Sequence, residues 1–334
     1  MPVRAEPLMG TTVTIEAVGA GHDATIERAF EWFRVVESTC TRFNEQSELY
    51  QLTLRSGSPV PVSQLLFEAI RFALSMAEAS DGAFDPTVGA TLQKRGFDRE
   101  HRTGTAIATI VQPSSDVSFR DVTIDESAQT VTLHRPLLLD LGAVAKGLAV
   151  DLAARELSVA RDFAIDAGGD LYLGGTNVEG EPWSIGIRHP REAGACIAAV
   201  RVSDRAVCTS GDYERRAPAG LTRPAPHVLD APPLPQTWRG PYQVRDDDSE
   251  ARSTTERSPD TEHHIIDPRT GASPQRVSSV TVIADSAMLA DALATSAFVM
   301  GPDAGLPWLE QMGVEALIVT STLESLTTPG WPGA

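Results

Sequence analysis

Residues 286–301 read SAMLADALATSAFVMG, a run of small and apolar side chains. An apolar run of this length predicts a buried helix. Asp291 and Thr295 are four residues apart in it, which places a carboxylate and a hydroxyl side by side on one helical face. This oxygen pair suits a hard cation such as Mg²⁺. The structural alternative is an aspartate that caps a nearby segment and a threonine bonded back to its own helix.

The composition is that of a globular protein with a real core. The chain has 334 residues, of which 42% are hydrophobic and 22% charged, as is ordinary for such proteins. Its net charge of -17 argues against nucleic acid and anionic membranes as partners. A phosphate-bearing ligand remains compatible, because a helix N-terminus, one lysine or a bound cation can outweigh a distant acidic surface.

The compartment is inferred from what the sequence lacks. No apolar run approaches the roughly 20 residues of a membrane helix, so we expect no integral membrane segment. The start, MPVRAEPLMGTTVTIEA, has no hydrophobic signal core. A cytoplasmic protein is expected, or an exported one if the chain has been trimmed. Cys40, Cys196 and Cys208 lack metal-ligand spacing and are expected to be reduced.

Hydrophobic periodicity predicts helices alternating with a strand-rich middle. The expected helices span residues 22–36, 64–80, 88–92, 143–157, 286–301 and 303–312. The expected strands span residues 11–17, 117–124, 130–134, 137–140, 163–166, 170–173, 183–187, 196–202, 206–209, 264–266, 279–283 and 316–320. This order favours an α+β fold over a regular βαβ alternation. Residues 217–260 are rich in Pro, Arg, Asp and Ser and are predicted to be a disordered or flexible insertion.

Four further stretches could carry chemistry. In 139–147, LDLGAVAKG, a strand leads through glycine into a helix whose N-terminus could bind an anion beside Lys146; a plain turn with a surface lysine is the alternative. In 166–170, DAGGD, the paired glycines let another backbone or a ligand approach closely, and a β-turn or bulge is the alternative. The stretch 209–213, TSGDY, is compatible with a turn that ends a strand. In 263–271, HHIIDPRTG, a histidine could serve acid–base chemistry or be structural.

Taken in order along the chain, these motifs resemble one known family, the FAD:protein FMN transferases (ApbE-like flavin transferases). The matching stretches are Met9-Gly10-Thr11, Ser47-Glu48-Leu49, GAFDPT at 82–87, DLGAVAKG at 140–147, Gly168-Gly169-Asp170, TSGDYER at 209–215, HIIDPRTG at 264–271 and ADALAT at 290–295. The resemblance covers nearly the whole chain. Its departures are the 217–260 insertion and the lack of the family's common export signal and lipid anchor.

The resemblance implies a fold and an activity. The fold would be α+β, with mixed or antiparallel sheets flanked by helices and a FAD cleft between sub-domains. Residues 1–334 would form a single transferase domain that contains the 217–260 insertion. The enzyme would use Mg²⁺ to split FAD, attach FMN to a Thr or Ser hydroxyl of an acceptor flavoprotein and release AMP. A Mg²⁺-dependent FAD pyrophosphatase and a non-catalytic flavin-binding protein are the alternatives.

The resemblance also implies the site residues. The metal would be held by the Ala143 carbonyl, Asp291 and Thr295, and His264 would be the catalytic base. The expected FAD contacts are Met9, Phe43, Ala83, Phe84, Asp85, Asp140, Lys146 and Ile265.

Overall fold

The computed structural model describes residues 3–98, 113–114, 116–213 and 263–332. The predicted insertion at 217–260 therefore lies outside the described residues. The helices are α1 (Asp23–Cys40), α2 (Glu48–Thr53), α3 (Gln64–Ala79), α4 (Gly89–Lys94), α5 (Gly142–Leu157), α6 (Ala287–Met300) and α7 (Pro302–Gln311), with 3₁₀ turns at Pro86–Val88, Phe119–Asp121 and Ser158–Ala160. No helix in these ranges is long and apolar enough to cross a membrane.

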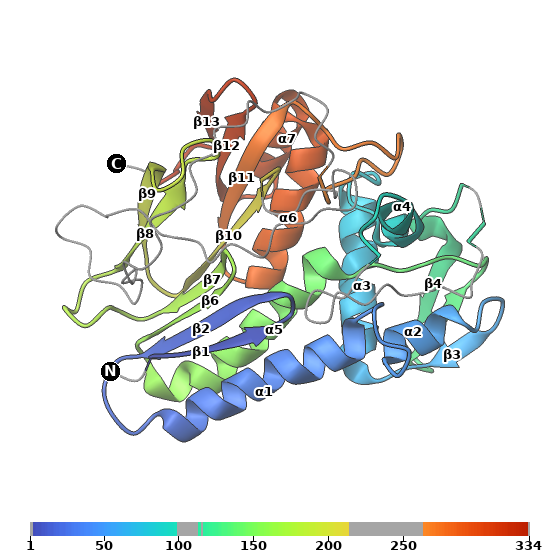
Figure 1. Ribbon diagram of the computed structural model, residues 1–334, viewed down its shortest axis with the longest axis horizontal. Coiled ribbons are helices and arrows are strands. Elements are labelled where there is room, and N and C mark those ends of the chain that lie inside the picture. Colours follow the sequence, from blue (N-terminus) through green and yellow to red (C-terminus); the bar gives the residue numbers. More distant parts are fainter. Residues whose placement is uncertain (1–2, 99–112, 115, 214–262, 333–334) are drawn as a thin grey trace, which may run out of the picture.

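An antiparallel sheet of eight strands forms one half of the molecule (Figure 1). In spatial order its strands are β1 (Val3–Leu8), β2 (Thr11–Ala17), β6 (Phe163–Ala167), β7 (Asp170–Gly174), β10 (Arg205–Gly211), β11 (Val277–Ala284), β12 (Glu315–Thr320) and β13 (Ser325–Thr327). Two smaller sheets join β3 (Pro59–Pro61), β5 (Thr130–Leu133) and β4 (Val122–Asp125), and β8 (Trp183–Arg188) with β9 (Cys196–Val202). The α+β prediction is confirmed.

Both faces of the main sheet are covered, because its central strands are apolar on both sides. Val207 and Ile283 belong to a small core shared with the β8–β9 hairpin. Their neighbours Cys208 and Val282 point to the opposite face and belong to the main core, as the two-residue period of a strand requires. In Figure 1, α6 lies between this sheet and the group formed by α3, α4 and the three-stranded sheet, and α5 runs from α6 along α1 beneath β1 and β2.

Helices α5 and α6 cross at a contact that only glycine permits. A Cβ atom at Gly147 would lie 2.4 Å from the Cα atom of Met288. One turn further along α5, the Asp151 carboxylate accepts hydrogen bonds from the Ser286 hydroxyl at 2.7 Å and from the Ala287 and Met288 N–H groups at 2.7 and 3.1 Å. A side chain of α5 thus satisfies the first N–H groups of α6, which fixes both the separation and the register of the two helices.

Two predicted strands are wrong. Residues 137–140 and 264–266 have no strand structure, although Leu137 and Leu139 are fully buried. A short apolar run predicts burial, but it cannot show whether a neighbouring strand is present to pair with. The Asp140 N–H instead donates to the Pro86 carbonyl at 2.7 Å. The short edge strands β1, β3 and β13 were not predicted.

The crossing predicts that Gly147→Ala destabilises the fold. The added methyl group meets backbone atoms of Met288, which cannot rotate away as a side chain could, so we expect a loss of about 1–3 kcal/mol or more in the free energy of unfolding. Urea unfolding measures it. Arg155→Ala, on the exposed side of the same helix, should stay within about 0.5 kcal/mol of the wild type. Equal stability of the Gly147→Ala variant would contradict the crossing geometry.

Candidate active site

The N-terminus of α5 is held by the Asp140 carboxylate. Its Oδ1 accepts from the Gly142 N–H at 2.9 Å, and its Oδ2 accepts from the Arg42 Nε–H at 2.5 Å. Ala143 follows with φ −90° and ψ 16°, away from the ψ of about −42° of a regular helix. This rotation turns the Ala143 carbonyl out of line with the helix axis. The carbonyl predicted to bind metal is therefore on a distorted first turn.

One turn into α5, Lys146 lies between two buried carboxylates. Its Nζ forms an ion pair with Asp170 of β7 and lies 3.9 Å from Oδ2 of Asp291 on α6. Asp170 is 1% exposed and Asp291 is 5% exposed. Burial of two carboxylates is costly unless cations compensate them. Among the described residues, Lys146 is the cation that lies beside both carboxylates, and a cation bound beside Asp291 would offset more of their negative charge.

Asp291 and Thr295 occupy the same side of α6, as their spacing predicts. The Thr295 hydroxyl is 3.0 Å from the Ser210 hydroxyl of β10. Within the described residues, no group of three His, Cys, Asp or Glu side chains is placed to hold a metal ion. A cation at α6 would thus depend on one carboxylate together with hydroxyl and main-chain oxygens. That all-oxygen donor set fits Mg²⁺.

An arginine links two of the predicted FAD contacts. The Arg42 guanidinium pairs with Asp140, donates to the Phe97 carbonyl at 2.6 Å, and lies 4.1 Å from the centroid of the Phe43 ring. Its side chain is 11% exposed. Arg42 was not predicted, because neither spacing nor composition shows that residues 42 and 140 meet. It holds Phe43 and Asp140 together.

The predicted contacts at 83–85 lie in a buried turn before α4. Ala83 and Phe84 are 2% and 5% exposed. The Asp85 carboxylate accepts from the Thr87 N–H at 2.8 Å, the Thr87 hydroxyl at 2.6 Å and the Phe119 N–H at 3.0 Å. Burial raises the pKa of Asp85, and these hydrogen bonds only partly oppose the rise. The Asp85 side chain therefore organises the turn from within, and the Ala83 and Phe84 N–H groups donate to Ser80.

This turn lies against the segment that leads into α5. Besides the hydrogen bond between Asp140 and Pro86, Gly89 packs on Leu138, where a Cβ atom would lie 2.6 Å from the Leu138 carbonyl oxygen. The turn at 83–85 and the start of α5 are therefore neighbours.

Met9 lies in the tight β1–β2 turn. Its φ is +51°, in the left-handed region that few residues other than glycine adopt, and its N–H donates to Glu37 of α1 at 3.0 Å. The next residue but one, Thr11, touches the β6–β7 turn, because a Cβ atom at Gly168 would lie 2.2 Å from the Thr11 hydroxyl oxygen. Asp170 begins the strand after that turn. Met9 is thus at the same end of the sheet as Asp170 and Lys146.

The two adjacent histidines have different surroundings. His263 is 2% exposed, its Nε2 is 2.9 Å from the Pro274 carbonyl, and its ring meets Phe298 of α6 edge-on at 5.4 Å. His264 is only half-buried, whereas Ile265 is 4% exposed. The structure therefore gives His263 a packing role and leaves His264 as the histidine that solvent or a ligand can reach.

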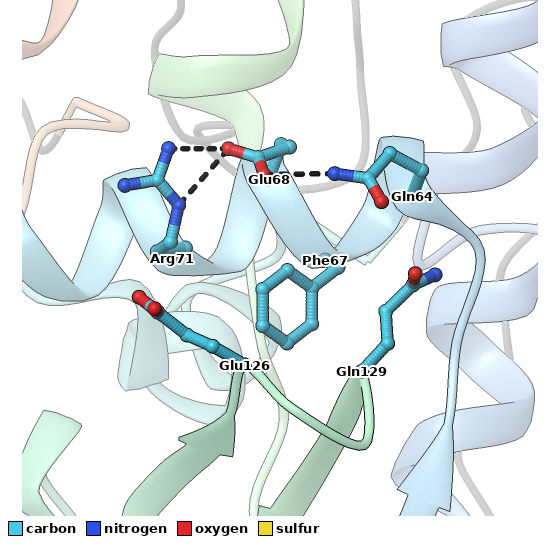
Figure 2. A pocket seen from close by; sticks show the side chains of 6 residues that line it. All are labelled: Gln64, Phe67, Glu68, Arg71, Glu126 and Gln129. Atoms are coloured by element: carbon cyan, nitrogen blue, oxygen red, sulfur yellow. Dashed lines mark hydrogen bonds and ion pairs between the residues drawn. The ribbon is translucent and has the colours of Figure 1, made fainter.

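A separate hollow lies between α3 and the β4–β5 turn (Figure 2). Its volume is about 270 Å³, and its lining residues are Gln64, Phe67, Glu68, Arg71, Glu126 and Gln129. In Figure 2, Glu68 is bonded to Arg71 and to Gln64 on the same helix. None of the predicted site residues lines this hollow, so it is distinct from the candidate active site.

Comparison with known proteins identifies the family and the fold. A profile of the ApbE family matches residues 9–234 and 250–318. The chain belongs to the ApbE family. The FAD:protein FMN transferase of Treponema pallidum is 30% identical over 95% of this chain and 83% of its own, and that of Haemophilus influenzae is 26% identical over 96% and 86%.

Two solved structures have the same ApbE fold. The ApbE protein of Thermotoga maritima aligns with a TM-score of 0.76 and 27% identity, covering 98% of this chain and 97% of its own. The flavin transferase ApbE of Vibrio cholerae aligns with a TM-score of 0.74 and 25% identity, covering 99% and 97%.

Three residues of this candidate site were not assigned from the sequence. Asp170 and Ser210 stand in the 166–170 and 209–213 motifs, whose glycines indicated turns and nothing more specific. No motif or spacing in the sequence pointed to Arg42. A buried Asp directly after paired glycines is the one local signal that could have pointed to Asp170.

The Asp85 environment predicts a specific pH dependence. Because the pKa of Asp85 is raised in the folded protein above the ordinary value of 3.8, the folded state holds the proton more tightly than the unfolded state. Wild-type stability should therefore fall relative to Asp85→Asn as pH rises through and above 3.8. Urea unfolding of both proteins across this range measures the difference.

Asp125 provides a control of opposite sign. Hydrogen bonds from Ser127 and Ala128 lower its pKa in the folded protein. The stability of Asp125→Asn relative to the wild type should decrease, not increase, as pH rises towards 3.8. A difference for Asp85→Asn that is flat or has this sign would contradict the prediction for Asp85.

Proposed function

We propose that this protein transfers the FMN half of FAD to a Thr or Ser hydroxyl of an acceptor flavoprotein and releases AMP. The observation that carries the proposal is Lys146, held between Asp170 and Asp291 at the start of α5. The Ala143 carbonyl lies one turn before Lys146 on α5, and Thr295 lies one turn after Asp291 on α6. The Lys146 ammonium and a metal ion held by these oxygens would both offset the negative charge of a pyrophosphate, so the arrangement suits that group. The names of the relatives support the same reaction.

The metal of the proposal is Mg²⁺, with Ala143, Asp291 and Thr295 as its protein ligands. When bound, it would neutralise charge on the phosphoryl oxygens of FAD. Lys146 would offer N–H donors to the same group. Arg42 lies over one face of the Phe43 ring. The rest of the ring would give a stacking surface for an aromatic ring of FAD.

His264 would act as the general base. The acceptor hydroxyl gives its proton to the His264 imidazole, and its oxygen bonds to the phosphorus of the FMN half. The P–O bond to the AMP half breaks, and AMP leaves with that bridging oxygen. With water in place of the acceptor, the same residues would produce free FMN and AMP, which is the pyrophosphatase alternative.

The first test is a mass-spectrometric assay of Asp291→Ala. Wild-type protein, FAD, Mg²⁺ and a flavoprotein domain with a candidate Thr should yield an acceptor heavier by one FMN, and a chelator should prevent this. Asp291→Ala should abolish Mg²⁺-dependent transfer, because Asp291 is the only carboxylate among the proposed ligands. The control Asp303→Ala removes an exposed carboxylate that pairs with Arg276, and it should transfer normally.

The products separate the alternatives. AMP and free FMN with an unmodified acceptor would favour the pyrophosphatase, and FAD that stays intact would favour a flavin-binding protein. Normal transfer by Asp291→Ala at the wild-type Mg²⁺ requirement would exclude the metal assignment.

The second test compares the adjacent histidines. His264→Ala should lower the transfer rate roughly 10²–10⁴-fold if its imidazole takes the acceptor proton. His263→Gln should reduce stability, because it removes a buried ring that packs on Phe298, and its rate per folded molecule should be less affected. Rates at saturating FAD, corrected for the folded fraction by circular dichroism, measure both. A larger rate loss in His263→Gln would reverse the two roles.

A further inference from the structure

The 209–213 motif supplies none of the proposed metal ligands or FAD contacts, yet its Ser210 side chain lies beside Thr295. Cys208 of β10 faces the helices and belongs to the main core. Ser210, two residues further along the same strand, faces the same side. Asp170 of β7 is the strand partner of Cys208. Adjacent strands therefore present Asp170 and Ser210 towards the crossing of α5 and α6.

Ser210 meets the hydroxyl of a proposed metal ligand. The two oxygens of Ser210 and Thr295 are 3.0 Å apart, and Ser210 is 8% exposed. A threonine hydroxyl has one proton and two lone pairs. If a lone pair of Thr295 binds a cation, its proton must point away from that cation. Ser210 is placed to accept the proton.

Ser296, the next residue on α6, shows the hydrogen bond that a helical hydroxyl makes when it has no partner on the sheet. Ser296 donates back to the Ala292 carbonyl at 2.7 Å, the usual bond of Ser and Thr within helices. The same conformation in Thr295 would direct its proton to the Asp291 carbonyl of its own helix. The bond to Ser210 provides a different partner, on the sheet.

We propose that Ser210 is a positioning residue for the cation site: it accepts the Thr295 proton and so aims a Thr295 lone pair at the metal. The proposal rests on the proposed function, since it takes Thr295 as a metal ligand. It gives the 209–213 motif a role without any contact to FAD. Partners of this kind, one step removed from a metal, change its affinity by about 10–100-fold when they are removed.

The other face of β10 carries a similar bond without this role. Thr209 and Thr281 have hydroxyls 2.9 Å apart, but their residues alternate with Ser210 and Val282, so they face the β8–β9 side. The hydrogen bond between Thr209 and Thr281 can therefore be removed, at Thr209 of the same strand, without altering the side of β10 that faces the cation site.

The experiment measures Mn²⁺ binding and Mg²⁺ dependence in the full chain. Free Mn²⁺ is followed by electron paramagnetic resonance during titration of the wild type, Ser210→Ala, Ser210→Thr and Ser296→Ala, with and without FAD. We expect Ser210→Ala to raise the Mn²⁺ dissociation constant by about 10-fold or more. Ser210→Thr, which keeps the hydroxyl, should restore much of the affinity. Ser296→Ala, a matched loss of a buried hydroxyl on α6, should bind Mn²⁺ as the wild type does.

The kinetics should show the same division. Ser210→Ala should need more Mg²⁺ for half-maximal FMN transfer, by about the same factor as its loss of Mn²⁺ affinity, while kcat at saturating Mg²⁺ stays close to the wild-type value. A merely structural loss would lower the folded fraction, seen as a lower Tm, without a shift in metal affinity.

The outcomes separate this inference from the proposed function. If the wild type transfers FMN with Mg²⁺ but Ser210→Ala binds Mn²⁺ as tightly as Ser296→Ala does, the role of Ser210 is wrong and the proposed function stands. Failure of Ser210→Thr to bind better than Ser210→Ala would also overturn the inference. A wild type that transfers no FMN, or transfers it without Mg²⁺, would overturn the proposed function itself.

Discussion

The contact between Gly147 and Met288 is the constraint on which the site depends. Because a Cβ atom at Gly147 would lie 2.4 Å from the Met288 Cα, the two helix backbones meet with no side chain between them. Asp151 then bonds to the first N–H groups of α6. Lys146 is adjacent to Gly147, so its distance from Asp291 is set by this crossing. A wider crossing would separate the charges on which the proposed chemistry relies.

The charges at the crossing are costly to bury, and the fold compensates for them locally. Asp170 and Asp291 are almost completely buried, and Lys146 is the cation placed between them. Replacing such a group by apolar side chains would often be as stable or more stable. The presence of this ion cluster in an otherwise apolar core is therefore better explained by ligand binding than by stability.

Two carboxylates of the candidate site, Asp85 and Asp140, hold main-chain segments in position. Both Asp85 oxygens accept hydrogen bonds within the protein, and both Asp140 oxygens do the same. These carboxylates hold a turn and a helix N-terminus in place. Arg42 connects the second of them to Phe43. Substrate recognition in such a site depends on several segments being held together.

The sequence by itself determined what depends on near neighbours in the chain. Asp291 and Thr295 share a helical face because their four-residue spacing follows from the helical period, and residues 286–301 are apolar enough to require burial. The resemblance of ordered motifs indicated the family. It also placed the predicted metal ligands on α5 and α6, two helices that pack against each other.

Only the tertiary structure decided the contacts between distant segments. Lys146 and Asp170 are 24 residues apart, Ser210 and Thr295 are 85 apart, and Arg42 and Asp140 are 98 apart. No local period relates such positions. The same limit explains residues 137–140, where burial was predictable from three leucines but strand pairing was not. Periodicity reports which side of an element is buried, and packing alone decides what it is buried against.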